Sequence, residues 1–298
     1  MVRALILKTV KTAILMMAMT VLTHLARAAE LQSATLLAWN SYVTESDWRL
    51  EQRVSGRQAF LWIDESGRAK RLRKGESVIA PMVERGSEAV PGGLIHHWIG
   101  AIFIPGAKID EVWAVTRDYD NYQRVYRPAV TASKTLLIAG ETQEFEMVWQ
   151  RRVLFVSAAM QGHYRSRNGL INERRGYSVT DATEVREIEE YGRAEERLLP
   201  PNTGHGFIWR IRSIARYEER DGGVYLEVEA LALTRDIPKG LVWVVNPVIN
   251  HLSVNSLDCT LRQTLAAVIA WRDKAGSEAA LPRHSSTEGG AGRLGAFQ

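Results

Sequence analysis

Residues 237–273 read IPKGLVWVVNPVINHLSVNSLDCTLRQTLAAVIAWRD and form the last long apolar segment of the chain. Apolar side chains recur there at spacings of three and four residues, which places them on one stripe of a helix. The members of this stripe are Val254, Leu257, Leu261, Leu265 and Val268. Because such a stripe needs an apolar surface to cover it, the segment predicts a long helix packed across a sheet. Asn246-Pro247 predicts a break or bend near the start of that helix.

Two segments just upstream supply strands for this helix to cover. Residues 207–217 and 224–234 both alternate between two kinds of side chain, as the two faces of a strand require. Between them, Asp221-Gly222 is a dipeptide typical of a tight hairpin turn. The sequence therefore predicts an antiparallel hairpin with the long helix across its apolar face.

The same turn predicts which residues of the hairpin lie opposite each other. Pairing across Asp221-Gly222 places Arg216 opposite Glu227, and Arg212 diagonal to Glu229. Such cross-strand charge pairs contribute roughly 0.2 to 1 kcal/mol each. Their charges predict that this face of the hairpin is exposed to solvent.

Residues 143–155 predict a further strand with one buried face. Its apolar side chains share one face, and these are Phe145, Met147, Trp149, Val153 and Phe155. Arg151 interrupts that face between Trp149 and Val153. Because an unpaired buried guanidinium is costly, Arg151 is expected either to meet a polar ligand head or to reach solvent beyond the edge of a cavity.

The segments before these strands predict a helix, short strands and one central strand. The expected elements are a helix over 31–54, strands over 58–64 and 77–82, a loop over 86–93, a central strand over 94–104 and a short helix over 108–117. The segment 94–104 is predicted to be central because it is almost continuously apolar. After the short helix, Tyr119 and Tyr122 are expected to pack at the rim of a cavity.

The N-terminal residues have the order of a secretory signal peptide. Basic residues come first, an apolar segment over 12–25 follows, and Ala26-Arg27-Ala28 supplies small residues for cleavage. The apolar part is shorter than the roughly 20 residues of a membrane-spanning helix. We expect cleavage after Ala28 and a periplasmic or secreted protein. An uncleaved N-terminal anchor is the alternative.

Removal of this segment changes the charge balance. Residues 1–28 hold four of the 38 Lys and Arg residues and no acidic residue, so the remaining 34 bases equal the 34 Asp and Glu residues. A mature chain without net charge gives no reason to expect a nucleic-acid partner. Cys259 is the single cysteine, so no internal disulfide can form.

The chain resembles the START-like (SRPBCC) superfamily, a helix-grip family that includes polyketide cyclase-like and coenzyme Q-binding domains. Three segments carry the resemblance, which are GGLIHHWIGAIFIPG over 92–106, DYDNY over 118–122 and VEALALTRDIP over 228–238. The resemblance covers roughly residues 33–272, and the secreted bacterial members are the most similar group. It implies an α+β fold in which a curved antiparallel sheet wraps around a long C-terminal helix.

Four parts of the chain follow from these patterns. They are a signal peptide over 1–28, an N-terminal helix with short strands over 29–91, a START-like domain over 92–273 and a disordered tail over 274–298. The tail is rich in Gly, Ser, Ala and charge and has little to bury.

Sequence patterns of known catalytic sites do not occur. The histidines form no zinc-protease motif, and there is no nucleophile elbow or phosphate-binding loop. We therefore expect no metal, no cofactor and no catalytic set. His96 and His97 point to opposite faces of a strand, so at most one of them can enter a cavity. If the protein were a cyclase- or aromatase-like enzyme, one of these histidines with Arg151 and Tyr217 would be the acid-base candidates.

The predicted function is the binding or carriage of a hydrophobic small molecule, such as a lipid, a quinone or a polyketide-like compound, between the sheet and the C-terminal helix. Membrane contact would be transient. A cyclase- or aromatase-like enzyme and a partner-binding protein with a filled core are the alternatives. The predicted ligand-binding residues are Phe145, Met147, Trp149, Arg151, Phe207, Trp209, Ile211, Tyr217, Leu261 and Leu265.

Overall fold

The computed structural model describes residues 29–153, 156–237 and 242–280. Its helical elements are α2 (Ser33–Val54), η1 (Trp62–Ser66), α3 (Ala69–Leu72), η2 (Glu84–Gly86), α4 (Ile109–Thr116), η3 (Tyr119–Asn121), α5 (Tyr122–Val125) and α6 (Val242–Ala280). Its strands are β1 (Ala29–Glu30), β2 (Val78–Pro81), β3 (Ser87–Val90), β4 (Gly93–Pro105), β5 (Val130–Ala139), β6 (Thr142–Val153), β7 (Val156–Asn172), β8 (Arg175–Glu189), β9 (Arg197–Leu198), β10 (Thr203–Gly204), β11 (Arg210–Arg220) and β12 (Gly223–Arg235).

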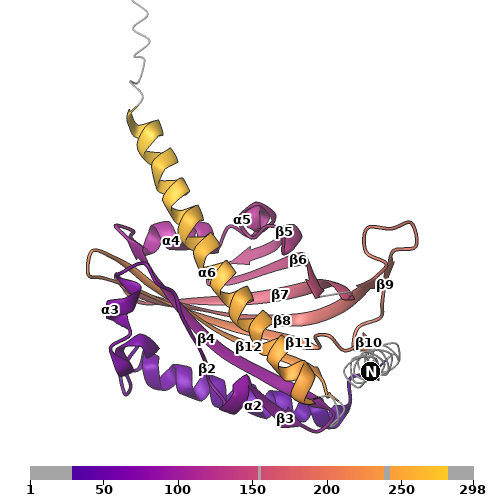
Figure 1. Cartoon of the computed structure of the whole chain (residues 1–298). Coiled ribbons are helices and arrows are strands. Elements are labelled where there is room, and N and C mark those ends of the chain that lie inside the picture. The colour runs from indigo at the N-terminus through magenta and orange to yellow at the C-terminus, as the bar shows by residue number, and fades with distance from the viewer. Residues whose placement is uncertain (1–28, 154–155, 238–241, 281–298) are drawn as a thin grey trace, which may run out of the picture.

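One large antiparallel sheet carries the fold (Figure 1). Its strands follow the order β2-β4-β12-β11-β8-β7-β6-β5, with β3 also paired to β4 and β9 to β8. The helix α6 crosses one face of this sheet, and α2 lies on the other side. A strand, short helices, further antiparallel strands and a long final helix make up the helix-grip arrangement, so the predicted fold class is confirmed.

The hairpin of β11 and β12 has the predicted turn and register. Asp221 and Gly222 have φ angles of 54° and 77°, which are the left-handed values that a two-residue turn of this kind needs. Arg216 pairs with Glu227, as the turn predicted.

Four predictions about individual elements are wrong. The segment 58–64 is not a strand, because its second part is the 3-10 helix η1, and the segment 86–93 contains the strand β3. The helix α6 runs without a break through Asn246-Pro247. It also continues past Asp273 to Ala280, so the start of the predicted disordered tail is helical. The signal peptide and residues 281–298 lie outside the described residues.

The face of the sheet under α6, here called the α6 face, is densely packed where the helix crosses β4. Leu257, Leu261 and Val268 of the predicted stripe are buried there against side chains of β4, β11, β12 and α4. Gly100 lets the helix approach the strand closely, since a Cβ atom at this position would lie 2.9 Å from Leu257 and Leu261. The stripe therefore covers the sheet as the sequence predicted.

The opposite face, here called the α2 face, is also covered. Trp39 of α2 packs with Ile95, Leu231 and Leu233. Near the other end of the helix, Leu50 packs with Val179 and Ile214. The sheet is thus enclosed by helices on both sides, and its central strands have no solvent face under α2.

Because this face is covered, the prediction that the charged face of the hairpin is exposed to solvent is wrong. Arg216 is 1% exposed and Glu227 is fully buried. Arg216 donates to Glu227 at 3.2 Å and to Glu229 at 3.0 Å. Glu227 also accepts hydrogen bonds from the backbone nitrogens of Trp62 and Ile63, at 3.0 and 2.8 Å. The backbone of η1 therefore covers charges that were expected from the sequence to be exposed to water.

The ion network continues to α2 through a histidine. Glu229 lies 2.9 Å from Nε2 of His97, whose Nδ1 lies 2.8 Å from the Tyr42 hydroxyl of α2. Burial works against the charged form of Glu229, but the bonds from His97 and Arg216 outweigh it and lower its pKa to about 2. Burial raises the pKa of Glu227 above its ordinary value, despite Arg216 beside it. We call Tyr42, His97, Arg216, Glu227 and Glu229 the buried ion network.

Candidate functional site

The α6 face of β6, β7 and β8 carries a cluster of aromatic and aliphatic side chains, here called the aromatic cluster. Its buried members are Tyr119, Phe145, Met160, Tyr164, Ala182 and Val185. Its half-buried members are Tyr122, Met147, Trp149, Ala158, Phe207, Ile208 and Ile211. The two groups come from four strands (β6, β7, β8 and β11), the segment after α4 and the segment before β11, so the cluster exists only in the folded chain.

Three rings stack at the centre of the aromatic cluster. The Phe145 ring lies between Tyr119, at a centroid distance of 3.9 Å and an interplanar angle of 7°, and Tyr164, at 4.9 Å and 11°. Trp149 donates from Nε1 to the Tyr164 hydroxyl at 3.0 Å. Contacts of this kind fix the orientation of large rings, so the inner part of the cluster is rigid.

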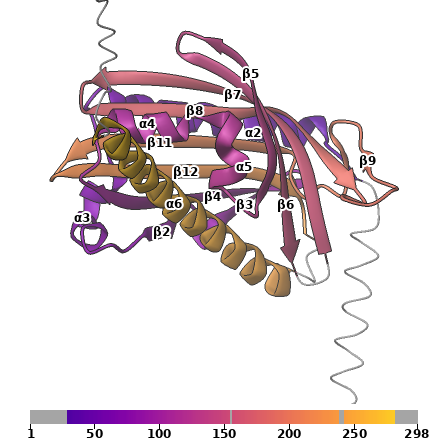
Figure 2. The ribbon, with the colours of Figure 1, turned by 90° about the horizontal axis from the view of Figure 1, so that it is seen from above.

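The half-buried members remain accessible because α6 covers the other half of the sheet. The helix packs chiefly against β4, β2 and β12 and against the short helices α4 and α5. Figure 2 shows α6 running diagonally past β4 and β12, with β5 and β6 beyond α5. Tyr126 after α5 joins the two sides, since its hydroxyl lies 3.1 Å from that of Thr264 in α6. An apolar surface on β6 to β8 is thus left beside the helix.

The structure brings together five of the predicted site residues. Phe145, Met147, Trp149, Phe207 and Ile211 all belong to the aromatic cluster. Phe145 is a buried member, whereas the other four are half-buried. Whether they bind a ligand stays a prediction.

Three other predicted residues lie in the packed core under α6. Tyr217 and Leu261 are buried there, and Leu265 packs against the same core. Tyr217 donates its hydroxyl to Thr116 of α4 at 3.3 Å. These side chains fill space between helix and sheet and do not line the half-buried surface.

The predicted position of Trp209 on the cavity wall is wrong. Its side chain packs with Trp39, Ile95 and Leu231 on the α2 face. The prediction extended the alternation of β11 back to Phe207, but β11 begins only at Arg210. Residues 207 and 209 are bends, so the regular alternation of a strand does not hold before Arg210.

Arg151 lies on the same face of β6 as Met147 and Trp149, two residues beyond Trp149. It is half-buried and pairs with Ala158 of β7 in the sheet register. Within the described part of the chain Arg151 has no ion pair. The position fits a polar group at the end of an apolar surface, and contact with a ligand head stays a prediction.

Sequence reasoning missed Tyr164, Met160 and Ile208 as members of the aromatic cluster. Residues 156–172 alternate less clearly than β6, because Gly162 and Ser166 interrupt the face that carries Met160 and Tyr164. The bulge next to this site lies in β8, where Thr183 is the extra residue. Tyr119 and Tyr122 were expected at a cavity rim. Both belong to the aromatic cluster, Tyr119 as a buried member and Tyr122 as a half-buried one, and a position at a rim stays a prediction.

The titratable groups facing this cluster are mostly phenols. Burial raises the pKa of Tyr119, Tyr122 and Tyr164 above the ordinary value, and that of Tyr126 to about 12. These groups are therefore neutral at physiological pH and act only as hydrogen-bonding groups.

The acid-base candidates for a cyclase-like reaction do not converge. His97 belongs to the buried ion network on the α2 face, whereas His96 lies 3.0 Å from the Thr234 hydroxyl through its Nε2. Burial lowers the pKa of His96 to about 4, so its imidazole is neutral near pH 7. Tyr217 is held in the packed core. The described residues therefore give the enzyme alternative no assembled acid-base set.

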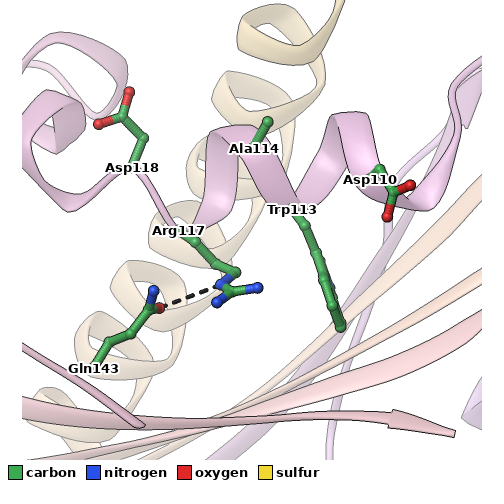
Figure 3. A pocket seen from close by; sticks show the side chains of 6 residues that line it. All are labelled: Asp110, Trp113, Ala114, Arg117, Asp118 and Gln143. Carbon is green, nitrogen blue, oxygen red and sulfur yellow. Dashed lines mark hydrogen bonds between the residues drawn. The ribbon is translucent and has the colours of Figure 1, made fainter. Parts of the chain in front are cut away.

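Two hollows stand out in the described part of the chain. One has about 400 Å³, lies beside α4 and is drawn in Figure 3. The other has about 550 Å³ and is lined by residues of 83–89. Neither is lined by a predicted site residue, so an enclosed cavity between α6 and the sheet stays a prediction.

Comparison with known proteins gives only distant similarities. The chain matches no protein family profile and no curated protein. Among solved structures, the Zhui aromatase/cyclase of Streptomyces sp. R1128 is 13% identical, covers 61% of this chain and 98% of its own, and has a TM-score of 0.42. A STAR-related lipid transfer protein of Xanthomonas axonopodis is 18% identical, with coverages of 64% and 98% and a TM-score of 0.41. Human STARD10 is 9% identical, with coverages of 71% and 82% and a TM-score of 0.42. Similarity at this level specifies neither a ligand nor an activity.

Proposed function

We propose that the protein binds an apolar small molecule on the α6 face of β6, β7 and β8, beside α6. The observation that carries this proposal is the set of large apolar side chains that the fold gathers on one surface and leaves half-buried. They are Met147, Trp149, Phe207, Ile208 and Ile211. Single exposed apolar residues are ordinary, but a contiguous apolar surface beside a helix is typical of a binding site.

The favourable free energy of binding would come from the ligand burying this apolar surface. Complete burial of a large apolar side chain is favourable by about 1.5–3 kcal/mol. Because these five side chains are already half-buried, each would contribute only part of that amount. Together they would supply several kcal/mol, and the rigid stack around Phe145 would limit the entropy lost on binding.

The proposed ligand is a lipid, a quinone or a polyketide-like molecule. Its apolar part would lie over Met147 and Trp149, and its polar end would meet Arg151. This orientation follows from the order of the three residues along one face of β6. The neutral phenols at the inner end of the surface would favour an uncharged end there.

We further propose that the protein works outside the cytoplasm after removal of residues 1–28. The order of basic, apolar and small residues in that segment supports export. In residues 29–153, 156–237 and 242–280, no helix is both long and apolar enough to cross a membrane.

The experiment is a ligand search on the gently purified mature protein. Organic extraction followed by mass spectrometry would identify a molecule that copurifies, and titration with a fatty acid and a ubiquinone would be followed by tryptophan fluorescence. Trp149→Ala and Met147→Ala should weaken binding at least about tenfold, since each removes apolar contact area. Trp48→Ala is the matched control, because Trp48 is 56% exposed on α2.

Two results would contradict the proposal. One is the absence of any copurified or titratable apolar compound. The other is binding that responds equally to Trp149→Ala and Trp48→Ala. In either case the alternative of a partner-binding protein with a filled core would take its place.

A further inference from the structure

The hollow beside α4 has a lining unlike that of the aromatic cluster. Its residues are Asp110, Trp113, Ala114, Arg117, Asp118 and Gln143. Figure 3 shows the Trp113 ring and the Arg117 guanidinium on the same side of α4, with Gln143 of β6 facing Arg117. Asp110 and Asp118 lie toward the two ends of the helix. A cation, an amide and an indole therefore meet in the middle of the hollow, between two carboxylates.

Arg117 has no counter-ion in the described ranges of the chain. Its Nε donates to Oε1 of Gln143 at 3.3 Å, and its guanidinium carbon lies 5.3 Å from the centroid of the Trp113 ring. Neither terminal nitrogen has a hydrogen bond to a described residue. A half-buried guanidinium in this state has lost part of its hydration without gaining an anion.

Gln143 supplies a second donor that is not used. The side chain is 4% exposed, and its Oε1 accepts hydrogen bonds from Tyr119, Asn168 and Arg117, at 3.1, 3.2 and 3.3 Å. Three donors on one oxygen fix the orientation of the amide. Its Nε2 then has no partner among the described residues, and it is not one of the fully buried unsatisfied atoms. This nitrogen is therefore accessible and can donate to a molecule in the hollow that Gln143 lines.

Two unused donors beside an aromatic face are complementary to a carboxylate attached to a flat apolar group. The rim carboxylates of Asp110 and Asp118 would repel a doubly charged anion more strongly than a singly charged one. We propose that this hollow binds a small monocarboxylate, with its carboxylate on Arg117 and Gln143 and its apolar part against Trp113. This site is separate from the proposed apolar ligand surface, and neither proposal depends on the other.

The test is calorimetric titration of the mature protein with 3-phenylpropionate. Saturable binding is expected, and 3-phenylpropanol, which has the same ring without the charge, should bind at least about tenfold more weakly. Inorganic phosphate should also bind more weakly. Arg117→Gln should weaken 3-phenylpropionate binding at least about tenfold, whereas Arg124→Gln on the exposed side of α5 should leave it unchanged.

A second variant keeps the test valid if Arg117→Gln does not fold. Gln143→Glu retains acceptor oxygens for the three donors but replaces Nε2 with an oxygen, so it should abolish binding of the carboxylate. The proposal is overturned if the wild type shows no saturable heat at millimolar 3-phenylpropionate, or if both variants bind it as the wild type does. Binding that Arg151→Gln removes and Arg117→Gln leaves would place the carboxylate at the aromatic cluster and would also overturn it.

Discussion

Replacing Arg216 with Met measures how strongly the buried ion network holds the fold together. Met preserves much of the length and apolar volume of the side chain but removes the charge and the bonds to Glu227 and Glu229. Both carboxylates are nearly inaccessible, with side-chain exposures of 0% and 6%. Removing one partner of a buried ion pair costs about 3–5 kcal/mol, because the remaining charge is left buried without compensation. We expect a loss of that size in the free energy of unfolding at pH 7.

The loss of unfolding free energy in Arg216→Met should be smaller at low pH than at pH 7. The pKa of Glu229 is about 2 in the folded protein, below its ordinary value of 4.5. A group with a lowered folded-state pKa stabilises the protein above its unfolded-state pKa, and that stability is lost as the pH falls toward the folded-state value. His97 and Arg216 together cause this lowering. Without Arg216 the carboxylates take up protons more easily, so the difference between variant and wild type should shrink between pH 7 and pH 4.

The assay is urea-induced unfolding followed by far-UV circular dichroism at both pH values. Arg165→Met is the matched control, because Arg165 forms an ion pair with Glu144 at 2.8 Å on the open surface of β7, with exposures of 55% and 32%. An exposed pair of this kind contributes about 0–1 kcal/mol. The reasoning is refuted if Arg216→Met costs no more than Arg165→Met, or if its cost stays the same at pH 4.

Three further predictions follow from the fold. Leu261→Asp should lower the free energy of unfolding by more than about 4 kcal/mol, because it buries an unpaired charge under α6. The control Ala266→Asp, on the exposed side of the same helix, should change the free energy of unfolding by about 0.5 kcal/mol. Equal melting temperatures of these two variants would show that α6 does not dock through its stripe. Trp209→Ala should lower the free energy of unfolding by about 3–5 kcal/mol in chemical denaturation, because it removes a buried ring. The folded variant should keep the wild-type affinity for an apolar ligand, because the Trp209 ring lies on the α2 face. A weakened affinity in folded Trp209→Ala would contradict that assignment. N-terminal sequencing of the exported protein should begin at Ala29 or within two residues of it, and a protein that still starts at Met1 would exclude cleavage.

The candidate site was predictable where it rests on one regular strand. Phe145, Met147 and Trp149 alternate within β6, so their common face could be read directly from the sequence. Tyr164 lies on a regular strand, but Gly162 and Ser166 on its two sides interrupt the apolar pattern of that face. Ile208 reaches the same surface from an irregular segment before β11. Side-chain alternation has a period of two only in regular strands, and a bulge or bend removes the information.

The sequence by itself determined the elements that depend on neighbouring residues. The stripe of α6 follows from the geometry of a single helix, and the pairing of Arg216 with Glu227 follows from the turn at Asp221-Gly222. In both cases the interacting residues are close in the chain, so local backbone geometry is sufficient.

Only the tertiary structure decided which faces are covered. Alternation shows that β11 and β12 have two faces. It does not show that η1, whose contacts with Glu227 span 164 and 165 residues, and the still earlier α2 enclose the charged face. The same distant contact places Trp209 against Trp39. A charge pair has the same sequence pattern in water and in a protein interior, because the pattern records which residues are paired and not what lies above them.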